Sequence, residues 1–511
     1  MSPTIILAIL LIFLGSLRYI LIPYASKNGR KLPPGPRPLP IIGNLHMLTT
    51  LPHRGLRDLA LKYGPIMSLR LGHVRTVIVS SSEAAELFLK KYDAVFAARP
   101  RGQASNYVLY SSKGLSFSEY GPYWRHMKKL IMSQLLCQSK IESFTGLRRE
   151  AFLSLLEELK SAAAAREVID ISGKVGELIE TITYRMILGR GNDDKDDLKG
   201  IINEVLSLIG AFNLADYVPL LGPLDLQGQT RRLKKLSKRI DQLMENILVQ
   251  HEQARERQGE CDSTHEDFVD VLLSLKKQHD INSQADDNHQ AFTIERDNIK
   301  AILLEMMGGS FDTSFTTILW TFAELLRNPR VMKNLQAELE SVIGTGKMVE
   351  ERDLGKLEYL DMVVKESFRL HPVGPLLIPR ESREDTTIEG YYIPKKSRIL
   401  VNAWAIGRDP SLWSQNADEF YPERFIGKDI DVRGHDFELL PFGSGRRGCP
   451  GIQLGLVTVR FVLAQLLHCF NWELPSGMEG KNIDMTESFG LAVGRANSDL
   501  LVKPTYRLLF G

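Results

Sequence analysis

The stretch Pro-Phe-Gly-Ser-Gly-Arg-Arg-Gly-Cys-Pro-Gly, residues 441–451, is a glycine-rich loop that closes on a cysteine. An apolar run with helical spacing, Ile452 to Phe470, follows it at once. Pro450 stands where a first helical residue is expected, and proline is tolerated there because its missing N–H would have no partner. The Cys449 sulfur is therefore expected at a helix N-terminus, where free N–H groups and the helix dipole lower the pKa of a thiol. A single thiolate predicts one axial metal-ligand position rather than a cluster.

A buried structural cysteine at an ordinary loop–helix junction is the alternative, and a lone cysteine beside glycines is more often that. The wider pattern favours the metal ligand. The motif Phe-x-x-Gly-x-Arg-x-Cys-x-Gly is filled by Phe442, Gly445, Arg447, Cys449 and Gly451. Average residue usage produces this motif by chance in roughly one such chain in ten thousand. With it the sequence resembles the haem-thiolate monooxygenases of the cytochrome P450 superfamily. The resemblance implies haem b as the cofactor, Cys449 as its axial iron ligand, and a cofactor-binding role for the other four residues.

Composition places the chain among ordinary globular proteins. Its 511 residues are 43% hydrophobic and 25% charged, and the formal net charge is +2. A net charge so close to zero gives no reason to expect a nucleic-acid partner. The four cysteines, Cys137, Cys261, Cys449 and Cys469, show no paired spacing, so neither a disulfide framework nor a zinc site is predicted.

The first residues predict a membrane anchor. Ile5 to Leu17 is uncharged and almost wholly apolar, and residues 1–24 carry one charge. That length matches the roughly 20 residues that a helix needs to span hydrocarbon. A cleaved signal peptide, the alternative, has its basic residues before the apolar core. Here they follow it, at Arg18, Lys27, Arg30, Lys31 and Arg37, and the positive-inside rule then leaves the rest of the chain on the cytosolic side.

Residues 25–44 predict a stiff connection, because five prolines fall between Pro33 and Pro40. A plain linker is the alternative. The resemblance implies the proline-rich hinge that orients microsomal members of the family on the endoplasmic reticulum membrane. The hinge and helix motifs look most like those of plant members, which points to plant secondary metabolism. For residues 45–511 the resemblance implies one large, mostly α-helical haem domain with a smaller β lobe.

Ile294 to Leu326 has helical periodicity over 33 residues, which predicts a helix of about 50 Å through the middle of the fold. Gly308 and Gly309 lie in its middle and cost roughly 2 kcal/mol of helix propensity relative to alanine, so something must offset them. One interpretation is close packing of another element against the glycines. The other is a local opening of the helix beside a bound ligand.

The residues after these glycines resemble the acid–alcohol motif of the same family, Ala/Gly-Gly-x-Asp/Glu-Thr-Thr/Ser. Gly309, Asp312, Thr313 and Ser314 match it, and Ser310 replaces the usual second glycine. The resemblance implies that Asp312 and Thr313 are catalytic and relay protons to dioxygen on the haem. It also implies that Gly309 borders the substrate.

Leu357 to Leu370 predicts another helix, on which Glu366 and Arg369 face the same way. Such a pair is usually a solvated surface pair of little energetic value. Here Pro-Glu-Arg-Phe follows at residues 422–425, and the order of the motifs matches the family. The resemblance implies that Glu366, Arg369 and Arg424 form an internal charge network with a structural role, which locks the loop carrying the cysteine.

Further binding residues follow from the resemblance. In the predicted helix Tyr120 to Leu136, Trp124 and Lys128 occupy the motif Trp-x-x-x-Arg that binds a haem propionate, although lysine offers a point charge instead of a fork. A surface tryptophan packed by a lysine stem is the alternative. Pro375 to Arg380 is expected as a short strand at the haem edge, with Arg380 on a propionate. The residues implied to contact substrate are Leu376, Leu377, Ile378 and Phe489.

Two shorter segments bear on the surroundings of the site. Ile66 to Leu71 and Thr76 to Val79 predict two strands joined by a turn. Ala211 to Leu226 is an apolar, proline-punctuated loop, for which a core-packed connection and a lip that dips into the membrane fit equally well.

The expected activity is that of the family: insertion of one oxygen atom from dioxygen into a lipophilic small molecule, by hydroxylation or epoxidation. Electrons are expected from NADPH through a flavoprotein reductase, and thiolate donation to haem iron favours cleavage of the O–O bond. Lys128, Lys129 and Arg446 are candidate reductase contacts, against the alternative of a merely solvated charged face. A haem-thiolate isomerase or dehydratase and a haem-based sensor are the other functions weighed. The acid–alcohol pair argues against the first, and the lack of a visible regulatory segment argues against the second.

Overall fold

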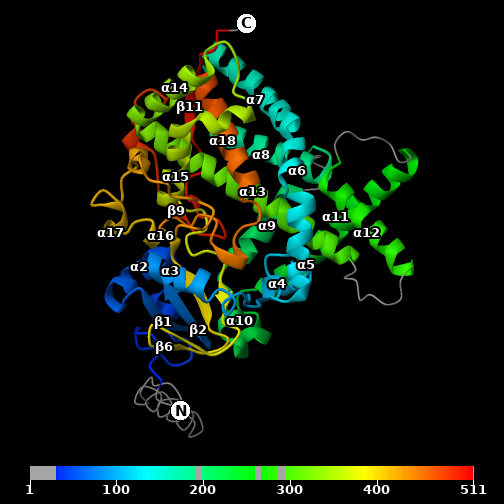
Figure 1. Ribbon diagram of the computed structural model, residues 1–511, viewed down its shortest axis with the longest axis vertical. Helices are drawn as coiled ribbons and strands as arrows, with labels where there is room; N and C mark the ends of the chain where they lie inside the picture. Colours follow the sequence, from blue (N-terminus) through cyan, green and yellow to red (C-terminus); the bar gives the residue numbers. More distant parts are fainter. Residues whose placement is uncertain (1–29, 192–197, 259–265, 286–293, 510–511) are drawn as a thin grey trace, which may run out of the picture.

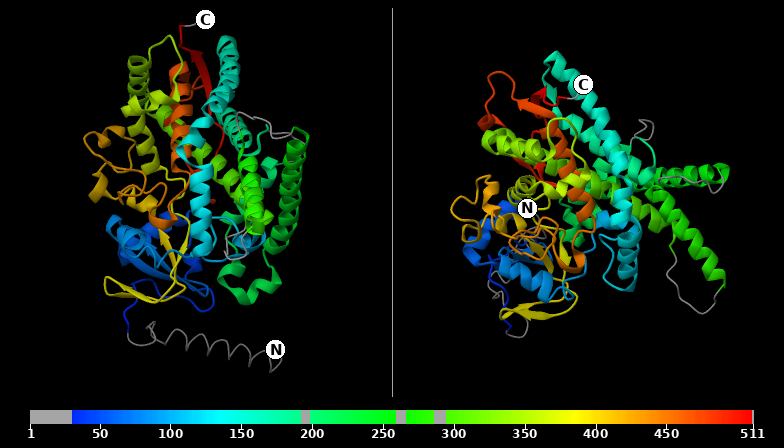
Figure 2. Two further views of the ribbon diagram at one scale, coloured as in Figure 1. Left: turned by 45° about the vertical axis from the view of Figure 1, so that its right-hand side comes forward. Right: turned by 45° about the horizontal axis from the view of Figure 1, so that its top comes forward.

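The structure is a computed structural model that describes residues 30–191, 198–258, 266–285 and 294–509, so the predicted anchor at residues 1–24 lies outside the described residues. The described chain forms a large helical body with a smaller β lobe at one end (Figure 1). Two further views show the same division, with the N-terminal strands at the end opposite the C-terminal strand (Figure 2). The predicted fold class, mainly α with a small β lobe, is confirmed.

The helical body contains most of the described chain. The helices of the described residues, of which α2 and α3 lie beside the β lobe, are α2 Pro52–Tyr63, α3 Ser82–Glu86, α4 Gln103–Tyr107, α5 Pro122–Leu130, α6 Gln138–Ser143, α7 Thr145–Ala165, α8 Ile171–Leu188, α9 Leu198–Gly210, α10 Leu214–Tyr217, α11 Gln229–Gln258, α12 Phe268–Ala285, α13 Arg296–Arg327, α14 Pro329–Ile343, α15 Glu358–Leu370, α16 Ala403–Ile406, α17 Pro410–Trp413 and α18 Ile452–Cys469. Short 3₁₀ turns connect several of them, among them Pro219–Leu224 and Pro422–Phe425.

The β lobe is built on a four-stranded sheet in the order β1-β2-β7-β4, in which β2 and β7 are parallel and the other two pairs antiparallel. The strands of the whole chain are β1 Ile66–Leu71, β2 Val74–Val79, β3 Ile169–Asp170, β4 Arg380–Glu381, β5 Thr386–Ile388, β6 Tyr391–Ile393, β7 Arg398–Val401, β8 Phe470–Glu473, β9 Glu487–Ser488, β10 Gly494–Arg495 and β11 Leu501–Tyr506. β1 has the predicted bounds, and β2 begins two residues earlier than predicted.

Helix α13 crosses the middle of the helical body and packs against α8, α15 and α18 (Figure 1). Its bounds, Arg296–Arg327, lie close to the predicted ones, and the helix is continuous through Gly308 and Gly309. Two described segments, Leu198–Tyr217 and α18, are long and apolar enough to cross a membrane. Most of α18 is buried inside the fold, which accounts for its apolar composition.

One predicted strand is wrong. Pro375 to Arg380 is largely irregular, and only Arg380 pairs, as the first residue of β4. The cause is the backbone at Leu377, whose φ of +50° is left-handed and cannot continue a strand.

Candidate active site

A cavity of about 370 Å³ lies between α13, the start of α18 and the 441–451 loop. Cys449 lines it, and so do Asp312 and Thr313. The rest of the wall contains many aliphatic side chains, among them Leu109, Leu115, Ile182, Val205, Leu304 and Leu454. The structure thus brings the predicted ligand and the predicted acid–alcohol pair to one apolar space, the kind of space that binds small molecules.

Cys449 is held by its backbone. Its N–H donates to the carbonyl oxygen of Phe442 over 2.9 Å, and α18 begins at Ile452. The Cys449 side chain is exposed to the cavity, yet desolvation by the surrounding protein raises the pKa of its thiol, and the N–H of Gly451 opposes this only in part. The expected lowering of that pKa is wrong for the uncoordinated sulfur, because loss of water outweighs the helix N-terminus. A bound metal cation would supply the missing stabilisation, since coordination deprotonates a thiol outright.

The motif residues around the cysteine have different surroundings. Phe442, Arg447 and Gly451 line the cavity. Gly445 does not line it, so its predicted contact with the cofactor is not supported. Its φ is +70°, and a Cβ there would collide with the carbonyl oxygen of Leu89 and lie 2.8 Å from the Asp93 carboxyl group. Close packing of the loop therefore explains why the position holds glycine.

Five basic side chains line the cavity: Arg99, Lys128, Arg380, Arg446 and Arg447. Arg446 is half-exposed and paired with Asp93, and the other four form the basic cluster. Burial lowers the pKa of each, and repulsion from the neighbouring arginines lowers it further for Arg99, Lys128 and Arg447. The pKa of Arg447 falls to about 10. Trp124 lies beside two of them, with its ring centroid 5.2 Å from Lys128 Nζ and 4.8 Å from the Arg447 guanidinium carbon.

The acids near this basic cluster do not balance its charge. Asp93 binds Arg380 through Oδ1 at 2.7 Å, and its Oδ2 binds Arg446 at 3.0 Å. Lys128 Nζ donates to a neutral group, the carbonyl oxygen of Arg446, at 2.8 Å. A buried excess of positive charge is costly unless a ligand neutralises it. A haem carries two propionates, so the cations, the thiol and the apolar cavity together fit that group.

Sequence reasoning missed Arg99. Its Nε donates to Ser116 O over 3.0 Å and its Nη1 to Pro379 O over 2.8 Å, so its position depends on segments far away in the chain. A single arginine before Pro100, in a stretch without periodicity, carries no local signal of this role.

Asp312 and Thr313 both reach the cavity from α13. Burial raises the pKa of Asp312 to about 6. No hydrogen bond to its carboxylate is found within the described part of the chain. The Thr313 hydroxyl donates to the carbonyl oxygen of Gly309 over 2.7 Å, which leaves its own lone pairs free to accept. An acid with a pKa of about 6 that shares a cavity with a hydroxyl can supply protons to that cavity near neutral pH.

The two central glycines of α13 fit different interpretations. A Cβ on Gly308 would lie 3.2 Å from Leu206, so close packing accounts for it. A Cβ on Gly309 would meet nothing within 4 Å, and Gly309 lines the cavity. No local opening of the helix accompanies them. Ser310, which stands where the family motif has glycine, donates to the carbonyl oxygen of Met306 over 2.7 Å and stays within the helix.

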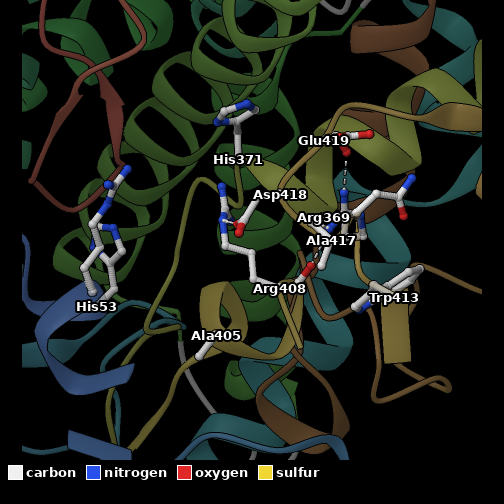
Figure 3. Close-up of polar contacts among 12 residues, drawn as sticks. His53, Arg369, His371, Ala405, Arg408, Trp413, Ala417, Asp418 and Glu419 are labelled. Carbon is white, nitrogen blue, oxygen red and sulfur yellow. Dashed lines mark hydrogen bonds and ion pairs between the residues drawn. The ribbon is translucent and has the colours of Figure 1, made fainter. Parts of the chain in front are cut away.

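Glu366, Arg369 and Arg424 form one buried network. Glu366 accepts from Arg369 at 2.7 and 2.8 Å and from Arg424 at 2.9 Å. The two arginines also bind the backbone carbonyls of a mostly irregular segment, namely those of Gly407, Trp413, Asn416, Ala417 and Glu419. Figure 3 shows Arg369 beside Ala417 and Glu419. The network therefore holds the segment 407–424, which precedes the cysteine loop, and not that loop itself.

Two of the residues expected to contact substrate lie elsewhere. Leu377 and Ile378 line the cavity, whereas Leu376 packs against the cluster under β1 and β2. The left-handed turn at Leu377 breaks the alternation that would point Leu376 inward. Phe489 lines a second, smaller cavity of about 220 Å³ and stacks on His53 at 6.1 Å. Asp312 lines both cavities, so it lies between them.

Comparison with known proteins identifies the family. The sequence model of a family described as cytochrome P450 matches residues 33–502. Cytochrome P450 CYP736A12 of Panax ginseng is 54% identical over 98% of this chain and 99% of its own length. Amorpha-4,11-diene 12-monooxygenase of Artemisia annua is 41% identical over 94% of both chains. A solved zebra fish cytochrome P450 with progesterone superposes with a TM-score of 0.73 at 26% identity, covering 89% of this chain and 99% of the other.

Proposed function

The chain belongs to the cytochrome P450 family and is a haem-thiolate monooxygenase, and from that premise we propose which of its residues carry the reaction and on what class of substrate. The observation that supports the proposal most is one cavity lined by a cysteine, an acid–alcohol pair and aliphatic side chains. Haem, when bound, supplies the activation of dioxygen, which the thiolate ligand favours. The protein supplies binding, orientation and protons.

Haem is held by Cys449 and by the basic cluster. Cys449 would provide the thiolate ligand, and Arg99, Lys128, Arg380 and Arg447 would bind the propionates. Trp124 supports two of these cations through the face of its ring. Without the two propionates, these four cations are buried close together, and the pKa of each is therefore lowered.

Protons come from the α13 side. The Asp312 carboxyl, with its pKa of about 6, is partly protonated at neutral pH and can be reprotonated from the smaller cavity that it also lines. During a transfer, the Thr313 hydroxyl accepts a proton and releases its own toward the cavity. Between transfers, the hydroxyl donates to Gly309 O, which holds the side chain in place. The same apolar wall that admits substrate limits water, which would otherwise divert the protons.

The substrate is an uncharged, mainly aliphatic small molecule. Most side chains that line the cavity are apolar, and the cations at its edge are committed to the propionates. Amorpha-4,11-diene 12-monooxygenase, one of the relatives, acts on a hydrocarbon by its name. That relative supports a hydrophobic compound of terpenoid size as the first class to test.

A flavoprotein reductase that uses NADPH delivers the electrons on the cysteine side. Arg446, in the cysteine loop, is half-exposed, and Lys129 is exposed on α5. These side chains offer a positive surface for an acidic partner.

The protein is anchored in the endoplasmic reticulum membrane by residues 1–24, with the hinge at 25–44 and the catalytic domain, 45–511, on the cytosolic side. Two groups of exposed apolar side chains support this orientation, because both lie close to the first described residues. Ile41 and Ile42 of the hinge are exposed, and so are Leu220, Leu224 and Leu226. The two groups are connected through the β1–β2 turn, where Gly72 N–H donates to Ile42 O and His73 N–H to Tyr217 O. The apolar loop thus fits a membrane lip better than a core connection.

The experiment is turnover of a panel of apolar compounds with a plant NADPH reductase, with product, NADPH and dioxygen all measured. Equal consumption of NADPH and dioxygen with an oxygenated product is expected. Product formed without dioxygen would indicate an isomerase or dehydratase, and haem binding without any turnover would indicate a sensor. Either result would refute the proposal.

A further inference from the structure

Glu305 is a carboxylate in the cavity wall that none of the roles above uses. It lies on α13, seven residues before Asp312. Its oxygens accept the backbone N–H of Leu115 at 2.7 Å and that of Ser116 at 3.1 and 3.2 Å. Burial raises the pKa of Glu305, and these two N–H groups act against the rise. An acidic side chain therefore reaches from the central helix to the backbone of a distant loop.

The opposite side of the same loop segment, Gly114–Ser118, is held by two arginines of the basic cluster. Arg447 donates to Leu115 O at 3.2 Å and to Ser118 O at 2.6 Å. Arg99 donates to Ser116 O at 3.0 Å. The N–H groups of the segment thus face a carboxylate, and its carbonyl oxygens face guanidinium groups. Since Leu115, Ser116 and Phe117 line the cavity, this fastened segment forms part of its wall.

Gly114 shows how closely the two parts fit. A Cβ on Gly114 would lie 2.5 and 2.6 Å from the two carboxylate oxygens of Glu305. Real Cβ atoms do not approach other atoms so closely, and the carboxylate cannot retreat without losing its two N–H donors. Glycine at 114 and glutamate at 305 are therefore matched to each other.

We propose that Glu305 is a positioning residue that fastens the Gly114–Ser118 segment over the cavity and thereby controls how fast substrate enters and leaves. The proposal deepens the function proposed above and rests on it. Hydrogen bonds to an ionised carboxylate are stronger than neutral ones, so the fastened state dominates. Substrate exchange requires these two bonds to break, while Arg99 and Arg447 keep the segment attached at the haem edge.

The first test is Glu305→Gln in the full-length haem protein. Gln keeps the size of the side chain but loses the charge and one of the two acceptor oxygens. Backbone amide exchange of the peptide that contains residues 114–118 is measured by mass spectrometry, and association of 4-phenylimidazole by stopped flow. Loss of charge-assisted hydrogen bonds is expected to speed both by roughly tenfold to a hundredfold. Carbon monoxide association is the reference measurement, because this ligand is small enough to enter without opening of the segment.

The matched control is Asp297→Asn. Asp297 binds Lys113 at 2.9 Å, so it joins the same loop to the same helix, but through an exposed pair. Changes of less than about twofold are expected there. Unchanged amide exchange in Glu305→Gln, or faster exchange with unchanged phenylimidazole kinetics, would overturn the proposal. A protein that binds no haem at all would instead refute the proposed function.

The second test is a double-mutant cycle. Gly114→Ala should displace the segment in the wild-type background and speed phenylimidazole exchange by at least about tenfold. In the Glu305→Ala background the collision is gone, so the same substitution should change the rates by less than about twofold. Equal effects of Gly114→Ala in both backgrounds would show that the segment does not depend on Glu305, and would overturn the proposal even if Glu305→Gln fails to fold.

Discussion

Replacing Glu366 by glutamine should destabilise the protein far more than the loss of one charge at the surface. Glu366 is fully buried and accepts hydrogen bonds from Arg369, Arg424 and the N–H of Tyr421. Glutamine keeps the shape but replaces one acceptor oxygen with an NH₂ group that faces guanidinium donors. Both arginines, which are also buried, would then have no counter-charge in the network.

The expected cost follows from that geometry. Removing one partner of a buried ion pair costs about 3–5 kcal/mol, because the remaining charge stays buried and uncompensated. Total stabilities of domains are only about 5–15 kcal/mol, so the variant should fold with little margin. The segment 407–424 would lose its fixed position first, since both arginines hold its carbonyls.

The assay is urea unfolding followed by far-UV circular dichroism and by haem absorbance. The control is Glu86→Gln, which removes the same charge from an exposed pair with Lys90 at 2.7 Å and should cost less than about 1 kcal/mol. A free energy of unfolding for Glu366→Gln within about 0.5 kcal/mol of this control would refute the reasoning.

Three further predictions concern the cavity. Asp312→Asn should stabilise the fold at pH 8 but not at pH 4. Burial raises the pKa of Asp312 from 3.8 to about 6, so ionisation of the buried carboxyl destabilises the folded state only as the pH rises through that range. Equal shifts of the melting temperature at both pH values would contradict this prediction. Thr313→Ala should divert electrons to peroxide at unchanged haem content, and unaltered coupling of NADPH to product would show that the hydroxyl is not needed. Arg99→Ala should weaken haem retention at least about tenfold, whereas Arg101→Ala, which removes an exposed partner of Glu119, should not; equal haem loss from both variants would remove Arg99 from the propionate site.

Contiguous motifs made much of the site predictable. The spacing around Cys449, the acid–alcohol pair on α13 and the Glu-x-x-Arg helix each lie within a few residues of sequence, so their relative positions follow from local structure. The cavity brings Cys449 together with Asp312 and Thr313, as the resemblance implied. The bounds of α13 and β1 were also predictable, because each has a clear hydrophobic period.

What failed depends on tertiary contacts or on single backbone angles. Arg99 and Glu305 act through bonds to distant segments, and no local pattern marks them. Leu376 was misplaced because the positive φ of its neighbour is invisible in an apolar run. The pKa of Cys449 was misjudged because the helix N-terminus can be inferred from sequence, whereas desolvation by the surrounding protein cannot.

The most direct measurement is the absorbance spectrum of the reduced carbon-monoxide complex, recorded for the purified wild-type protein and for Cys449→Ser. The wild type should show the red-shifted Soret band of a thiolate ligand, and the variant should lose it while α-helical circular dichroism is retained. A wild-type band typical of a nitrogen ligand, or an unchanged band in Cys449→Ser, would contradict the assignment of Cys449 as the haem ligand.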